Sequence, residues 1–180
     1  MTDAGGLASP IVHLGHGASG SATSMAPFVE GLRARGIAAA AVDLPKRRAE
    51  DAVAPWRAVV PDGRSTVAGG HSYGGRVASL AAAEEGSDYA GLVLFSYPLH
   101  PPGAPERAPA RVGHWPAIRC PVLLLSGESD PFARIALLRS AVRDLPDAAL
   151  VTYPRLGHTL APALDDVLDR VASFVQRLAR

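Results

Sequence analysis

Six short, continuous apolar runs alternate along this chain with segments of helical period, and this alternation is the strongest constraint on its fold. Such runs are typical of buried parallel strands, because both faces of the strand are covered and apolar residues need not alternate with polar ones. The predicted strands are residues 11–14, 37–42, 66–68, 92–95, 122–125 and 150–153. The pattern predicts a three-layer α/β/α sandwich with a mainly parallel sheet of about six strands.

Helical segments are predicted between these runs. Apolar residues recur with helical spacing over residues 25–32, 77–81 and 135–142, and again over 164–178, where Pro162 suits the first turn. Residues 49–60 are predicted to form a short helix. The stretch 96–117 is too short and too rich in proline to form a helical lid domain, which indicates an open site.

Composition limits the class of protein. A chain of 180 residues with 48% hydrophobic residues suits one globular domain over residues 1–180. The net charge is only +1 and the 18 Lys and Arg residues are dispersed, which argues against nucleic acid as a partner. The sequence shows no signal peptide and no apolar stretch of about 18 residues, so we expect a cytoplasmic protein without a membrane span. The single cysteine, Cys120, is predicted to be a buried apolar residue.

A G-x-S-x-G pentapeptide, Gly70-His71-Ser72-Tyr73-Gly74, directly follows the third predicted strand and precedes a helix. A serine hydroxyl becomes a useful nucleophile when a sharp turn exposes it beside a base, and flanking glycines permit such a turn. The context therefore predicts a nucleophile elbow with Ser72 at its tip.

An acid and a histidine follow the serine in the order that a nucleophile-elbow fold requires. Asp130 comes after the fifth strand and His158 after the sixth. Taken alone, Asp130 could be a helix cap before Pro131, and His158 could be a solvated loop residue. Together with Ser72 they project from one edge of the sheet, which predicts a catalytic triad, with Glu128 as the alternative acid.

An oxyanion hole needs two backbone donors. The N–H of Tyr73, directly after the nucleophile, is the first, and we assign the second to Ala18 in the glycine-rich loop 15–20 after the first strand. That loop could instead hold a phosphate. However, it lacks the G-x-G-x-x-G spacing and a Walker lysine, which disfavours nucleotide binding.

These motifs resemble those of the α/β-hydrolase superfamily and, more narrowly, of small predicted hydrolases related to dienelactone hydrolases and to the KANL3/Tex30 group. The likeness covers nearly the whole chain from Ile11 onward and implies a Ser-His-Asp esterase-type site without a cofactor. Only about nine residues precede the first strand, where the superfamily usually has a further strand or hairpin. We therefore expect a minimal sheet whose edge is exposed or covered by a partner subunit, so a homo-oligomer is possible. The residues that carry the resemblance are His16-Gly17-Ala18, Gly70 to Arg76, Gly127 to Phe132 and Gly157-His158.

Several other polar and aromatic residues lie near predicted strand ends. We expect His71 to have a packing role and Arg76 to bind backbone carbonyls or a carboxylate. No histidine spacing supports a closed ligand set, so no metal site is predicted. The residues that could line a substrate pocket, with loop packing as the alternative, are His16, Gly17, Tyr97, Leu99 and His100, and further His114 and Trp115.

The sequence therefore predicts a hydrolase that cleaves a small carboxylic ester or thioester through an acyl-enzyme intermediate. Two alternatives stay open. One is a non-catalytic interaction module that retains the hydrolase fold. The other is an acyltransferase, which would use the same triad with an acceptor other than water.

Overall fold

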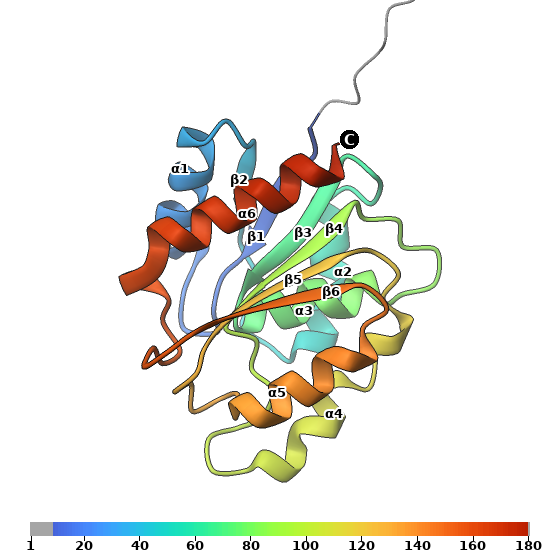
Figure 1. The fold of residues 1–180 in the computed structure, drawn as a ribbon. Helices are drawn as coiled ribbons and strands as arrows, with labels where there is room; N and C mark the ends of the chain where they lie inside the picture. The colour runs from blue at the N-terminus through green and yellow to red at the C-terminus, as the bar shows by residue number, and fades with distance from the viewer. Residues whose placement is uncertain (1–8, 180) are drawn as a thin grey trace, which may run out of the picture.

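A six-stranded, wholly parallel sheet forms the centre of the computed structural model, which describes residues 9–179 (Figure 1). The strand order β2-β1-β3-β4-β5-β6 places the first strand inside the sheet, and β2 and β6 lie at its two edges. The predicted α/β/α sandwich with six parallel strands is confirmed. The strands are β1 (Ile11–Gly15), β2 (Ala39–Val42), β3 (Thr66–His71), β4 (Gly91–Phe95), β5 (Val122–Gly127) and β6 (Ala148–Tyr153).

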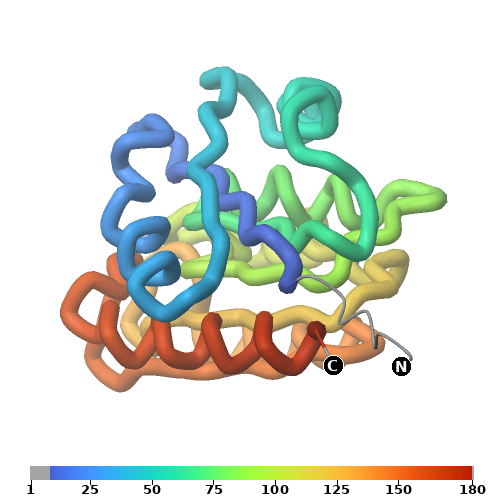
Figure 2. Tube along the Cα trace, turned by 90° about the horizontal axis from the view of Figure 1, so that it is seen from above, coloured from blue at the N-terminus to red at the C-terminus, as the bar shows by residue number. Residues whose placement is uncertain are grey.

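Helices cover both faces of the sheet. On one face α1 (Ala26–Ala34) packs with α6 (Leu164–Leu178), and on the other lie α2 (Ala49–Val59) and α3 (Tyr73–Ala82). Figure 2 shows α6 and α2 on opposite sides of the sheet. A further helix, α5 (Ile135–Ala141), packs on the same face as α3. Each face thus has its own apolar core, which explains why the strands read as continuous apolar runs.

The elements match their predictions closely, with differences at the ends. β3 extends three residues beyond the predicted 66–68, through Gly69 and Gly70. Glycine is disfavoured within strands, but here a side chain does not fit: a Cβ on Gly69 would lie 2.3 Å from the carbonyl oxygen of Val93. Pro162 lies in a 3₁₀ turn, Ala161–Ala163, and not in α6 itself.

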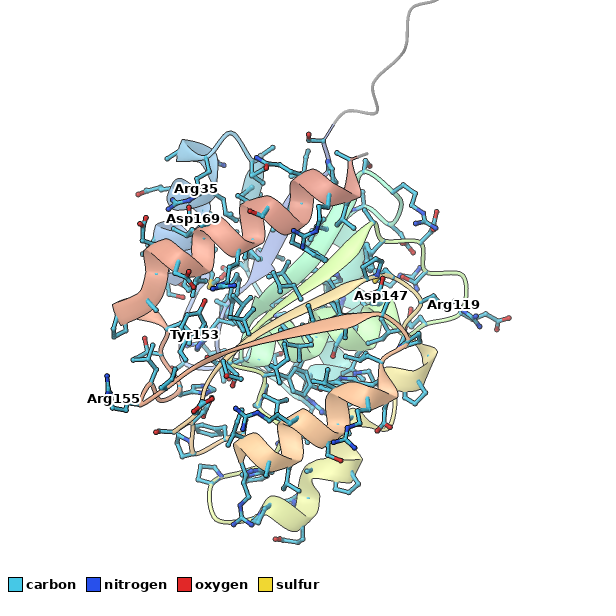
Figure 3. All side chains as sticks on the ribbon, in the orientation of Figure 1. Arg35, Arg119, Asp147, Tyr153, Arg155 and Asp169 are labelled. Carbon is cyan, nitrogen blue, oxygen red and sulfur yellow. The ribbon has the colours of Figure 1, made fainter. Side chains whose placement is uncertain are left out.

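Ion pairs join the two helices on one face. Arg35, at the end of α1, donates from its Nε to the Asp169 carboxylate at 2.6 Å, and the pair is visible in Figure 3. A second carboxylate on α6, that of Asp165, also accepts from Arg35. These contacts are largely exposed, so they orient α1 against α6 more than they stabilise the fold.

The loops of interest leave the sheet at one edge. Tyr153 ends β6 and leads to Arg155 at the carboxyl edge, whereas Arg119 and Asp147 lie at the opposite edge (Figure 3). Ser72, Asp130 and His158 follow β3, β5 and β6, so all three lie at the carboxyl edge, where parallel α/β sheets place their functional residues.

The proline-rich stretch 96–117 folds into short helical turns and forms no helical lid. It contains α4 (Ala108–Val112) between two 3₁₀ turns, Pro105–Arg107 and Trp115–Ala117. Trp115 is fully buried and packs edge-on against Tyr97, with ring centroids 5.0 Å apart. This anchor holds α4 over the carboxyl edge of the sheet.

Two further sequence predictions concern burial and membrane association. Cys120 is buried as expected, and burial raises the pKa of its thiol to about 11, so the thiol stays protonated. Within residues 9–179, none of the helices is both long enough and apolar enough to cross a bilayer.

A pH-dependent contribution to stability is expected from His114. Its Nε2 donates to the Ser79 hydroxyl at 2.8 Å, because that hydroxyl donates to the carbonyl of Arg76. Burial, and then the Arg76 charge, lower the pKa of His114 to about 4. The unfolded state therefore takes up a proton first as the pH falls below about 6.5, and the free energy of unfolding should fall by up to about 3 kcal/mol.

Urea unfolding at pH 7 and at pH 4.5, on wild type and on His114→Gln, measures this contribution. We expect the variant to lose less stability between the two pH values than wild type does. An identical loss in both proteins would contradict the assignment to His114.

Candidate functional site

Ser72 occupies the sharp turn between β3 and α3. Its φ of 50° lies in the left-handed region, which is strained for a residue with a side chain. The turn is locked by the Ser72 N–H, which donates to the carbonyl of Phe95 at 2.9 Å, and by the Gly74 N–H, which donates to the carbonyl of His16 at 2.9 Å. A strained serine on the turn between a strand and a helix is typical of a nucleophile elbow.

Gly70 and Gly74 of the pentapeptide must be glycines because their backbone packs directly against Gly15 at the end of β1. A Cβ on Gly74 would lie 2.2 Å from the Gly15 carbonyl, and one on Gly70 would lie 2.4 Å from the Gly15 oxygen. Such contacts with backbone cannot be relieved by a side-chain movement. The glycines thus let α3 start directly against β1 and bring Ser72 beside the loop that follows β1.

His158 joins Ser72 to Asp130 by hydrogen bonds. Its Nε2 lies 2.9 Å from the Ser72 Oγ, and its Nδ1 lies 2.8 Å from the Asp130 Oδ2. Because the Asp130 carboxylate can only accept, Nδ1 carries the proton and Nε2 is left as the acceptor for the Ser72 hydroxyl. The structure therefore brings together the three residues that the sequence predicted to form a triad.

The loop after β5 holds Asp130 in place. Asp130 is buried, and its second oxygen, Oδ1, accepts from the Phe132 N–H at 2.8 Å. The other acid of the loop points elsewhere: the Glu128 carboxylate accepts from Arg139 at 2.7 Å and from the Thr152 hydroxyl at 2.8 Å. Asp130, and not Glu128, is the carboxylate that His158 contacts.

Two aromatic rings flank the imidazole of His158. The ring of His71 packs edge-on against it with centroids 5.0 Å apart, and the ring of Phe132 lies 4.5 Å away. The Nε2 of His71 also donates to the backbone carbonyl of His158 at 3.1 Å. Burial lowers the pKa of His71, so this ring stays neutral and positions the loop that carries His158.

The two predicted oxyanion donors lie on the pocket that contains Ser72. Ala18 and Tyr73 both line this pocket. Tyr73 is the first residue of α3, so its N–H has no acceptor within the helix. Among residues 9–179, the Ala18 N–H donates to no other group. Both N–H groups are thus available to a substrate oxygen.

The pocket at Ser72 has a volume of about 610 Å³, enough for a small organic substrate. Its walls come from the loop between β2 and α2, from the start of α3 and from the stretch 96–117. The lining residues are Ala18, Arg47, Arg48, Ala49, Glu50, Ser72, Tyr73, Arg76, Pro98, Pro101, Pro102, Arg107, Ala110, Arg111 and Phe132.

The five residues expected to line the pocket lie behind its surface. Tyr97 and Leu99 are buried in the core because β4 continues into the apolar cluster beneath α4. His100 is buried and accepts from the Arg134 N–H through its Nε2 at 2.9 Å, which braces the loop of Asp130. The alternative interpretation is therefore correct for these three residues: they pack within the fold and do not line the pocket.

The other two expected lining residues support the loop after β1. His16 is buried; its Nε2 accepts from the Leu44 N–H at 3.0 Å, so its Nδ1 donates to the carbonyl of Gly17 at 2.7 Å. Gly17 lies against the His71 ring, where a Cβ would be 3.0 Å from Nδ1. Both shape the backbone next to Ala18 and do not line the pocket.

Of the further candidates, Trp115 is buried in the core and His114 binds Ser79, so neither lines the pocket. Arg76 donates to the carbonyl of Arg111 at 3.1 Å and pairs with Glu50. That is the role expected for it, although it also reaches the pocket wall. Among residues 9–179, no cluster of His, Cys, Asp and Glu is placed to hold a metal ion.

The arginines that line the pocket are not among the residues predicted from the sequence. Two signals point to them. Lys46-Arg47-Arg48 forms a basic run in the loop between β2 and α2, at the carboxyl edge of the sheet. Arg107 and Arg111 are four residues apart, on one side of a helical turn.

Comparison with known proteins agrees with the fold described above. A family model described as "Alpha/beta hydrolase domain" matches residues 9–176. A dienelactone hydrolase from Anabaena variabilis is 25% identical, with a TM-score of 0.71 over 94% of this chain and 87% of that chain.

Two further solved structures share the fold. A monoacylglycerol lipase from Paleococcus ferrophilus is 16% identical, with a TM-score of 0.77 over 95% of each chain. Est1E from Butyrivibrio proteoclasticus, solved with ferulic acid bound, is 18% identical, with a TM-score of 0.75 over 94% of this chain and 89% of that chain. No curated protein matches the sequence.

Proposed function

The chain belongs to the alpha/beta-hydrolase family, and from that membership and the geometry at Ser72 we propose that it is a serine hydrolase of a carboxylic ester or thioester. One observation carries the proposal. The Ser72 hydroxyl, the His158 imidazole and the buried Asp130 carboxylate form a continuous hydrogen-bonded line that ends at an open pocket. This arrangement activates a hydroxyl for attack on an acyl carbon.

In the first half of the reaction, the Ser72 Oγ attacks the acyl carbon while its proton moves to the His158 Nε2. Asp130 stabilises the resulting imidazolium through Nδ1–H. The N–H groups of Tyr73 and Ala18 donate to the oxyanion of the tetrahedral intermediate. Collapse of the intermediate expels the alcohol or thiol, which takes the proton from His158.

In the second half, water attacks the acyl carbon on Ser72 and His158 accepts its proton. The bond between the acyl carbon and the Ser72 Oγ then breaks, the Oγ takes the proton back from His158, and the carboxylic acid leaves. The same residues would serve acyl transfer if another acceptor entered in place of water. The pocket opens to solvent and the described chain forms no lid domain over it, which favours water as the acceptor.

A fluorophosphonate probe tests the proposal, because it phosphonylates only an activated serine. We expect stoichiometric labelling of the folded protein on the peptide that contains Ser72, and hydrolysis of p-nitrophenyl butyrate by the unlabelled protein. Labelling should disappear after unfolding in urea. If the folded protein is neither labelled nor able to hydrolyse short acyl esters, it is a non-catalytic module and the proposal is wrong.

A further inference from the structure

The pocket at Ser72 is strongly basic. Its lining includes five arginines and a single carboxylate, that of Glu50, whereas the whole chain has a net charge of only +1. The five are Arg47, Arg48, Arg76, Arg107 and Arg111. A concentration of one sign of charge around a cleft raises the local concentration of ligands of the opposite sign.

The arginines stand on separate walls. Arg47 and Arg48 come from the loop before α2, and Arg107 and Arg111 come from the turns around α4. A ligand in the pocket would therefore meet arginines on two sides. Guanidinium binds carboxylate and phosphate through paired, parallel hydrogen bonds, so this is the kind of site that clamps an oxyanion group.

The protein itself neutralises little of this charge. Glu50 pairs with Arg76, and its other oxygen lies 3.7 Å from Arg48. In the part of the chain that the structure describes, Arg47, Arg107 and Arg111 have no carboxylate within 4.0 Å. Burial, and then the charge of Arg76, lowers the pKa of Arg111, so the surroundings of Arg111 disfavour an unpaired positive charge there.

We infer that the substrate carries, besides its ester or thioester bond, an anionic carboxylate or phosphate group, which Arg107 and Arg111 bind from one wall and Arg47 from the other. This inference rests on the proposed hydrolase function. Arg76 is left out of the binding set, because Glu50 and the carbonyl of Arg111 already occupy its guanidinium.

Two matched pairs of substrates test the inference and distinguish the two anions. For carboxylate on the acyl side, mono-4-nitrophenyl glutarate is compared with 4-nitrophenyl pentanoate. For phosphate on the leaving group, S-butyryl-4′-phosphopantetheine is compared with S-butyryl-pantetheine, which has the same thioester without the phosphate. We expect kcat/KM for the anionic member of at least one pair to exceed that of its neutral partner by about tenfold or more at low salt. The preference should shrink as NaCl screens the charges.

Arginine variants then locate the effect. Arg107→Gln and Arg111→Gln should each reduce the anionic-to-neutral ratio of kcat/KM by about tenfold. Arg143→Gln, which removes an exposed arginine outside the pocket, should leave that ratio at its wild-type value. Because each ratio is measured on one protein preparation, partial misfolding of a variant does not change it.

The outcomes separate the inference from the proposed function. If neutral esters are hydrolysed but neither anionic partner is preferred, the inference is overturned and the hydrolase function stands. An unchanged ratio in both pocket variants also overturns it. If no substrate is turned over and Ser72 is not labelled, the proposed function fails and the inference with it.

Discussion

Ser72→Ala is expected to lower kcat for p-nitrophenyl butyrate by on the order of a millionfold and to abolish labelling by a fluorophosphonate. The loss is this large because the substitution removes the attacking oxygen, and His158 and Asp130 then have no nucleophile to activate. Alanine keeps a Cβ in the same strained backbone conformation, with φ near 50°, so the fold should be retained. Initial-rate assays and near-UV circular dichroism measure the two effects.

The matched control is Ser140→Ala, which removes a hydroxyl from the exposed surface of α5. It should keep wild-type activity and labelling. Appreciable turnover by a well-purified Ser72→Ala protein would show that another group is the nucleophile.

Asp130→Asn is expected to lower kcat by on the order of ten-thousandfold. The Asp130 carboxylate holds the proton of His158 on Nδ1 and stabilises the imidazolium that forms in the transition state. An amide offers less negative charge and can donate to Nδ1, which would place the ring proton on Nε2 and remove the base that faces Ser72. Initial rates measure the loss of activity. Because Asp130 is also buried, the thermal midpoint of the variant is measured as well, to show that the protein is still folded.

Glu128→Gln provides the control for the acid, because it changes a carboxylate two residues away that binds Arg139 and Thr152. It should keep near-wild-type kcat. If Glu128→Gln lost more activity than Asp130→Asn at equal stability, the acid would have been assigned to the wrong residue.

Much of the fold could be predicted from local sequence. Buried parallel strands need apolar side chains on both faces, so β4 and the first four residues of β5 read as continuous apolar runs. The prediction fell short where long-range packing overrides local preference. β3 continues through two glycines because neighbouring backbone approaches too closely for a side chain, and nothing within β3 itself reveals that neighbour.

The residues of the site divide in the same way. Ser72, Asp130 and His158 could be predicted because each lies in the turn or loop that follows a strand, and the carboxyl ends of parallel strands meet at one edge. The residues that form the pocket wall could not be predicted in this way. Tyr97, Leu99 and His100 also follow a strand, but Trp115 anchors α4 over them and turns Arg107 and Arg111 toward the pocket instead.

The sequence by itself determined the strand and helix alternation, the elbow at Ser72 and the chain order of acid and histidine, because these depend on local residue patterns and on their order along the chain. Only the tertiary structure decided that His158 lies between Ser72 and Asp130 at hydrogen-bond distance, and that the pocket beside them is lined with arginines. Those facts depend on how segments far apart in the chain pack together. Such packing is set by the shapes of both surfaces and cannot be read from either segment alone.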